Sequence, residues 1–189
     1  FPFNKFPGTD MLLSPEMRST GEVMGSDTEL GYAFAKAYEA AGMRLPLRGR
    51  VLMTVKHGDK RTIVSEARTL AQLGYELQAT GGTWRALRAA GLPAERINKV
   101  HEGRPHIVDA IKNGTIDMVF NTPSGPGSRH DDTYIRSTSI TQGIPCVTTM
   151  SGIQAVVSAL NALHQGPTSV RPIQKEPAPG AAKDVAATK

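Results

Sequence analysis

The stretch Tyr75–Leu87, YELQATGGTWRAL, contains the turn that decides the fold. Its first six residues have the composition of a short strand, and the run TWRALRAAG that begins at Thr83 has the composition of a helix. Only Thr-Gly-Gly-Thr joins them. A strand that ends in a small, hydroxylated, glycine-rich turn and opens a helix is typical of phosphate binding, because the first N–H groups of the helix point at the anion. The turn therefore predicts a phosphate-holding α/β unit, and the phosphate belongs either to a substrate or to a signal.

Strands and helices alternate in the same way on both sides of this turn. The short links between them predict an α/β fold with a five-stranded parallel sheet flanked by helices, a Rossmann-like three-layer arrangement. Right-handed crossovers would bring the carboxyl ends of the strands to one edge, where such folds bind their ligands. The expected strands are Arg50–Val55, Tyr75–Thr80, Arg96–Val100, Met118–Thr122 and Ile144–Thr149, and the expected helices are Asp59–Leu73, the one opened by Thr83, His106–Asn113, one that starts near Thr133, and Ser151–His164.

Two of these helices have clear apolar faces. Apolar residues recur about every 3.6 positions in Asp59–Leu73 and again in Ser151–His164, which is the period of a helix packed on one side. Asp59 is the expected N-cap of the first, and Gly74 is its expected stop.

The remaining segments divide the chain into zones. Phe1–Gly25 is rich in proline and glycine and has no helix or strand period. Thr28–Gly42 consists of good helix formers with Gly42 as a plausible stop, and Met43–Gly49 reads as a linker. From Pro167 the chain has little apolar mass and no period, so we expect a disordered tail.

Composition excludes several classes of protein. The net charge of +5 invites a nucleic-acid binder, but the basic residues are dispersed and no zinc-finger or RNA-binding signature is present. Salt-dependent DNA binding would be the observation in favour of that alternative. No apolar run approaches 18 residues, so no membrane span is expected, and FPFNKFPGTD does not read as a signal peptide. Because the chain does not begin with Met, it looks cut from something longer.

The single cysteine, Cys146, excludes an internal disulfide and fits a reducing compartment. It lies in the apolar run IPCVTT, so we expect a small core residue rather than a nucleophile.

The loops that follow the expected strands are all rich in hydrogen-bond donors. Ammonium groups, hydroxyls, an amide and exposed N–H groups suit phosphate and ribose, which mostly accept hydrogen bonds. No Walker sequence and no GxGxxG fingerprint is present. The donor residues are Lys56, His57 and Lys60, Thr80 and Thr83, Lys99, Asn121 and Thr122, and Thr148, Thr149 and Ser151.

Other constellations point less clearly to chemistry. His101 and His106 are five residues apart and have no cysteine cluster beside them, so no metal site is expected. Asp131 and Asp132, next to His130, could belong to an acid–base group, or one of them could cap the helix near Thr133, and capping is favoured. No serine or cysteine triad stands out.

Three segments carry a family resemblance. PEMRSTGEVMG (residues 15–25) resembles the end of the second ATP-using half of the carbamoyl phosphate synthetase large subunit. NKVHEGRPHIVDAIKNG (98–114) and FNTPSG (120–125) resemble the C-terminal allosteric domain of that subunit, which has a methylglyoxal-synthase-like fold. The resemblance covers about Phe1–Ala162. It implies the end of an ATP-grasp domain at 1–25, a connecting helix and linker at 26–49, the allosteric domain at 50–166 and a tail at 167–189.

The resemblance also implies a regulatory site for nucleotide monophosphates, with UMP as inhibitor and IMP as activator in many bacteria. The matching positions are Thr54, Lys60, Thr80, Thr83, Lys99, Asn121 and Thr122. Lys60, Thr80 and Thr83 would hold the phosphate, and Lys99, Asn121 and Thr122 would lie towards the ribose and base. Thr148 matches part of an ornithine site, but Cys146 replaces its tyrosine, which argues against ornithine activation. Pro123 replaces a further threonine of that family.

The rival interpretation is a methylglyoxal synthase, a lyase that needs a carboxylate base to abstract a proton next to a carbonyl. Arg104 and His57 occupy the two positions at which that family has its catalytic aspartates, and a guanidinium cannot act as the base. We therefore expect no catalytic residues in this chain.

For the whole subunit, the resemblance implies a cytoplasmic, ATP-dependent ligase with Mg and K that uses glutamine-derived ammonia from a glutaminase small subunit. Its product would feed pyrimidine and arginine synthesis. The role of Trp84, as helix packing or as a wall against a base, stays open at this point.

Overall fold

The computed structural model describes residues 23–123 and 129–170. The interpretations of residues 1–22 as the end of an ATP-grasp domain and of 171–189 as a disordered tail lie outside the described residues. The helices are α1 (Leu30–Ala40), α2 (Lys60–Gln72), α3 (Gly81–Ala89), α4 (Ile107–Lys112), α5 (Arg129–Thr141) and α6 (Met150–Gln165), the strands are β1 (Arg50–Thr54), β2 (Glu76–Thr80), β3 (Ala94–Ile97), β4 (Met118–Asn121) and β5 (Cys146–Val147), and two short 3₁₀ turns are η2 (His57–Asp59) and η3 (Val100–Glu102).

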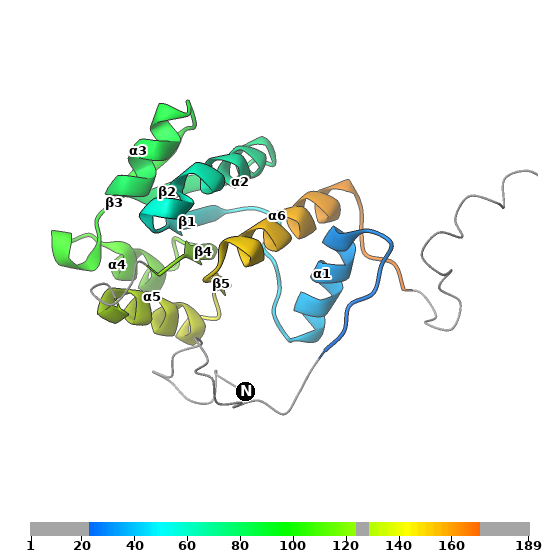
Figure 1. Cartoon of the computed structure of the whole chain (residues 1–189). Helices are drawn as coiled ribbons and strands as arrows, with labels where there is room; N and C mark the ends of the chain where they lie inside the picture. Colours follow the sequence, from blue (N-terminus) through cyan, green and yellow to red (C-terminus); the bar gives the residue numbers. More distant parts are fainter. Residues whose placement is uncertain (1–22, 124–128, 171–189) are drawn as a thin grey trace, which may run out of the picture.

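The five strands form one sheet in the order β3-β2-β1-β4-β5, and every neighbouring pair is parallel (Figure 1). The expected five-stranded parallel sheet is confirmed. The chain builds β2 and β3 on one side of β1 and then crosses to build β4 and β5 on the other side. The order therefore reverses at β1 and β4, which is the kind of position where open α/β sheets bind ligands.

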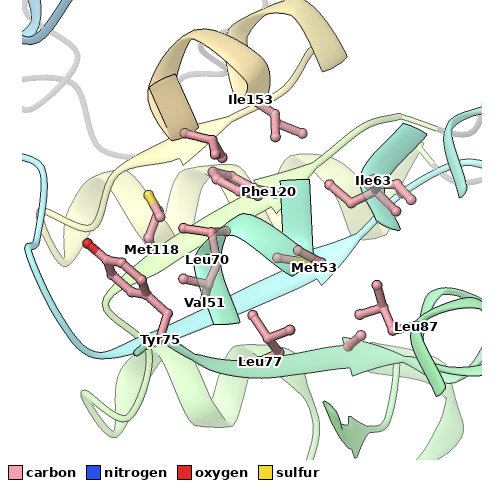
Figure 2. Close-up of a cluster of buried hydrophobic side chains, with 14 of the residues drawn as sticks. Val51, Met53, Ile63, Leu70, Tyr75, Leu77, Leu87, Met118, Phe120 and Ile153 are labelled. Atoms are coloured by element: carbon pink, nitrogen blue, oxygen red, sulfur yellow. The ribbon is translucent and has the colours of Figure 1, made fainter. Parts of the chain in front are cut away.

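Two apolar clusters lie on opposite faces of the sheet. On one face, α2, α3 and α6 pack on side chains such as Met53 and Phe120, and Figure 2 shows Leu70 and Ile153 closing over that surface. On the other face, α4 and α5 pack on Leu52 and its neighbours. The three-layer arrangement follows from the alternation of buried side chains along each central strand.

Helix α1 adds to the first of these faces by packing on α6 (Figure 1). A Cβ on Gly31 would lie 2.6 Å from the carbonyl oxygen of Ser158, so only glycine allows the two helices to approach this closely. Helix α1 stops as expected at Gly42 (φ +79), and α2 stops at Gly74 (φ +89). Among the described residues, no helix is both long and apolar enough to cross a membrane.

The expected bounds are wrong at both edge strands. Strand β3 begins at Ala94 and ends at Ile97, because its only partner, β2, ends opposite it at Thr80. Strand β5 is reduced to Cys146–Val147, because the chain turns at Thr149 to cap α6. Beyond the end of a partner strand no ladder hydrogen bonds can form, whatever the local composition.

One capping prediction is also wrong. Helix α5 begins at Arg129, four residues before the expected start, so Asp131 and Asp132 lie in its first turn instead of capping it. There they still interact favourably with the positive end of the helix dipole. Asp59 is the N-cap residue of α2 as expected, although its side chain makes no capping hydrogen bond and its carboxylate lies 3.9 Å from the Lys56 ammonium.

Candidate functional site

The carboxyl ends of the three central strands bring together most of the expected ligand-binding residues. Thr54 ends β1, Thr80 ends β2 and Asn121 ends β4, and Thr54 is directly opposite Asn121 in the ladder. Side chains alternate between the two faces along a strand. The residue before each of these three belongs to the apolar cluster under α2, α3 and α6, so all three side chains point to the other face of the sheet. Three residues that are far apart in the sequence thus lie together at one edge of the sheet.

A set of hydrogen bonds orients the threonine hydroxyls at this edge. The Thr80 hydroxyl donates to Thr54 Oγ1 at 3.2 Å. Val55 N–H donates to Thr83 Oγ1 at 3.2 Å, and Lys56 N–H donates to Thr122 Oγ1 at 3.0 Å. A hydroxyl that accepts such a bond keeps its own hydrogen available to donate. Thr54, Thr83 and Thr122 therefore each keep an O–H that can donate a hydrogen bond.

The first turn of α3 has no side-chain cap. Thr80 is its N-cap residue, but the Thr80 side chain makes no capping bond and instead donates to Thr54 Oγ1. Helix α6 differs, since its N-cap Thr149 accepts a hydrogen bond from Gly152 N–H at 3.1 Å. A helix N-terminus whose first N–H groups have no side-chain cap is suited to phosphate.

Lys60 places a positive charge beside this turn. Its ammonium nitrogen lies 2.8 Å from the position that a Cβ on Gly82 would occupy. The same nitrogen is 3.5 Å from Nδ1 of His57. The absence of a side chain at residue 82 thus makes room for the cation, which gives this glycine a reason beyond the turn itself.

Asn121 contributes a buried amide with unused capacity. The residue is 0% exposed, and its Nδ2 donates to the carbonyl oxygen of Asp132 at 3.5 Å. Among the described residues, its Oδ1 has no hydrogen-bond partner. An unpaired buried acceptor costs about 1–3 kcal/mol, which makes this oxygen a candidate contact for a ligand.

Two of the expected ligand-binding residues make no hydrogen bond to these threonines or to Asn121 in the described part of the chain. Lys99 is exposed and follows β3, and its N–H donates to Glu102 Oε2 at 3.1 Å. Thr148 is half-buried and precedes the α6 cap. Within residues 23–123 and 129–170, neither side chain bonds to the threonines or to Asn121.

The resemblance to methylglyoxal synthase places that lyase's two carboxylates at residues 104 and 57, and this chain has an arginine and a histidine there. Arg104 is 80% exposed, and its Nη2 lies 3.6 Å from Asp109 Oδ1. His57 lies in η2, beside Lys60. The other two histidines considered above have separate roles, since His101 Nδ1 lies 3.0 Å from Asp131 Oδ2 and His106 caps α4. In the part of the chain that the structure describes, no three potential metal ligands gather.

Two further residues become clear only in the structure. Trp84 donates from Nε1 to the carbonyl oxygen of Ala94 at 3.0 Å and packs on the apolar cluster, so it is a packing residue. Arg96 on β3, which sequence reasoning missed, lies beside Gly81 at the start of α3. The only signal for it was a basic residue within a short strand. Cys146 is buried in the second cluster, which confirms its expected place in the core.

Comparison with known families agrees with this fold. Residues 62–148 match the MGS-like domain. The match runs from the first turn of α2 to the residue after β5. It is 48% identical over 174 residues to the carbamoyl phosphate synthase large chain of Nostoc sp. and 47% identical over 174 residues to that of Brucella suis, in each case over 92% of this chain. Over 165 residues, 87% of this chain, it is 50% identical to the large chain of Ralstonia nicotianae.

The resemblance to the C-terminal region of these large chains is thereby confirmed. This chain spans only 15–16% of the length of the same three relatives. The matched residues include the turn Thr80–Thr83, whereas Thr54 and Lys60 precede the match.

Proposed function

We propose that this chain is the regulatory region of a glutamine-dependent carbamoyl phosphate synthase large chain and binds a nucleotide monophosphate at the carboxyl edge of its sheet. UMP is the proposed inhibitor, and IMP is a proposed activator at the same site. The observation that carries the proposal is the set of hydroxyls of Thr54, Thr83 and Thr122, each held by an internal hydrogen bond so that its hydrogen is free to donate.

The phosphate would lie at the first turn of α3. There it would accept from the open N–H groups and the Thr83 hydroxyl, and the Lys60 ammonium beside Gly82 would supply the opposite charge. Thr80 would act indirectly, because its hydroxyl donates to Thr54 Oγ1 and so orients the Thr54 hydroxyl. Charge-assisted hydrogen bonds of this kind are the strong ones in anion binding.

The ribose and base would extend from the α3 turn towards β4 and the loop after β3. Asn121 Oδ1 is a buried acceptor that could take an N–H of a pyrimidine or purine, and Thr122 offers a donor next to it. Lys99 would close the site from the loop after β3. This arrangement matches a ligand that has acceptors at the phosphate and at least one donor on the base.

The same residues make a lyase the weaker proposal. A methylglyoxal synthase would share the phosphate turn, but Arg104 and His57 provide no carboxylate to remove a proton. We therefore propose that the chain alone has neither lyase nor synthetase activity. In the complete cytoplasmic enzyme it would act on upstream domains that use ATP, Mg and K with a glutaminase partner, supplying pyrimidine and arginine synthesis. By linkage, ligands of the ATP sites would then change the affinity for UMP.

Calorimetric titration of the full chain with UMP, IMP and ornithine tests the proposal. Lys60→Ala should weaken UMP binding by about tenfold or more, which corresponds to the loss of one charge-assisted contact. Arg68→Ala is the matched control, because Arg68 is an exposed cation on the same helix, about 12 Å further along its axis. Thr83→Ala should also weaken UMP binding, and Thr83→Ser should retain it. If a folded wild-type chain binds neither UMP nor IMP, the proposal is wrong.

A further inference from the structure

We propose that Arg96 is a second cation of the phosphate site and makes it selective for a phosphomonoester dianion over a singly charged phosphodiester. This inference rests on the proposed nucleotide site. It adds a specificity-determining residue that neither the sequence motifs nor the family resemblance assigns.

The position of the guanidinium is the first argument. Arg96 Nε and Nη2 lie 3.8 and 3.9 Å from the position of a Cβ on Gly81, the first residue of α3. Cβ bonds in an α-helix tilt towards its N-terminus, so a group at this place lies at the rim of the open first turn. Lys60 occupies the corresponding place at Gly82. Since successive side-chain directions differ by about 100° around a helix axis, the two cations approach the turn from different sides.

Strand register explains why Arg96 reaches this turn. Arg96 is paired with Ala79 in the β2–β3 ladder, one residue before the end of β2. Its neighbour Ile97 faces the α4 side of the sheet, so Arg96 faces the side on which α3 packs. The side chain is thereby directed along the edge of the sheet to the start of α3.

The charge on Arg96 has no partner among the residues that the structure describes. Within residues 23–123 and 129–170, the guanidinium forms no ion pair or hydrogen bond. The adjacent Glu95 lies 3.7 Å from Arg50, which also binds Glu76 at 2.6 Å. The nearest carboxylate in the sequence is thus shared with another arginine, and Arg96 remains available to an external anion.

The charges near the turn match a dianion. Lys60 and Arg96 each carry one positive charge, and the start of a helix adds the equivalent of about half a charge. A phosphomonoester carries about −1.5 to −2 near neutral pH, whereas a phosphodiester carries one negative charge. The second cation therefore adds more binding free energy for the monoester than for the diester.

A structural role for Arg96 makes a different prediction. Long basic side chains often cover apolar surface with their methylene groups while the charge stays in water. In that case Arg96→Gln would alter stability and would weaken all ligands by the same factor. The ratio of affinities for a monoester and a diester of the same nucleoside separates the two roles.

The experiment is a calorimetric titration of the full chain with UMP and with uridine 5′-methylphosphate, at one ionic strength. Arg96→Gln should weaken UMP about tenfold and the methyl ester clearly less, so the preference for UMP falls, and Arg96→Lys should restore most of it. Arg88→Gln, the same charge change at the other end of α3, should leave both affinities unchanged. An unchanged UMP-to-ester ratio in Arg96→Gln would overturn the inference and leave the nucleotide site standing.

Inorganic phosphate distinguishes failure of the nucleotide proposal from failure of this one. If the wild-type chain binds phosphate but neither nucleotide, the proposed function is wrong, and a tenfold loss of phosphate affinity in Arg96→Gln still supports the inference. If the wild-type chain binds none of the three, both are overturned.

Discussion

Replacing Gly82 with alanine adds one methyl group at the phosphate turn and brings it against a single neighbour, Lys60. The new Cβ would lie 2.8 Å from Lys60 Nζ and 3.3 Å from Lys60 Cε. To reach an ordinary contact of 3.4 Å, the ammonium must retreat by about 0.6 Å, and the end of a lysine side chain can do so at little cost. We therefore expect the fold to accept the substitution and the cation to leave its place.

The two effects of Gly82→Ala should have opposite signs. Gly82 does not have a positive φ, so alanine fits the helix there, and alanine is favoured over glycine by up to about 1 kcal/mol in a helix interior. The free energy of unfolding should thus stay level or rise. A charge-assisted hydrogen bond contributes about 1.5–3 kcal/mol, and because Lys60 is flexible and half-buried we expect the lower figure, about a tenfold loss of UMP affinity.

Calorimetry and urea denaturation measure the two quantities on the same preparation. Gly81→Ala is the matched control, because its Cβ would meet the Arg96 guanidinium at an ordinary 3.8 Å and should leave binding intact. A double-mutant cycle then tests the cause. If Gly82→Ala acts by moving the ammonium, adding it to Lys60→Ala should cause no further loss.

Either of two results would refute this reasoning. Full UMP affinity in Gly82→Ala would mean that the ammonium beside residue 82 does not contact the phosphate. Fully additive losses in the cycle would mean that the methyl group blocks the backbone N–H groups directly and that Lys60 acts elsewhere.

Three other changes have expected outcomes. Asn121→Leu should alter the free energy of unfolding by less than about 1 kcal/mol in urea, because removal of the unpaired oxygen offsets loss of the long 3.5 Å bond from Nδ2 to the Asp132 carbonyl, and a larger loss would contradict this. Thr149→Ala should cost about 1 kcal/mol through loss of the bond from Gly152 N–H, and equal loss in Thr149→Ser would refute capping. Burial raises the pKa of Tyr38 and of Tyr75 to about 12, so their contribution to stability is complete below pH 10 and is lost as the pH rises to 12. Ultraviolet titration with both phenols ionising near pH 10 would be the contrary result.

The elements that could be predicted from sequence are those with a strong period or a terminal glycine. Helices α2 and α6 repeat apolar residues at helical spacing. Gly42 follows the end of α1 and Gly74 follows the end of α2, each in the left-handed conformation that glycine tolerates. Helix α5 could not be placed as well, because its first residues, Arg129–Asp132, are all polar and carry no apolar period. Strand β5 is short because of where the chain turns, which its composition does not record.

The candidate site divides in the same way. Thr80 and Thr83 could be identified from the turn that contains them, since a strand, a glycine-rich link and a helix start lie within a few residues. Arg96 could not be identified in this way, because its position beside α3 depends on its pairing with Ala79 in another strand. Lys99 was expected at the end of β3, but the strand ends two residues earlier and leaves its side chain exposed.

The sequence by itself determined the alternation of strands and helices, the parallel sheet and the phosphate turn in YELQATGGTWRAL, because these depend on neighbouring residues and on local periods. Only the tertiary structure decided which hydroxyls are held with a free hydrogen, which amide oxygen stays unpaired and which cations flank α3. Those properties depend on distances between residues far apart in the chain. Packing of the sheet and its helices sets such distances, and no local pattern carries them.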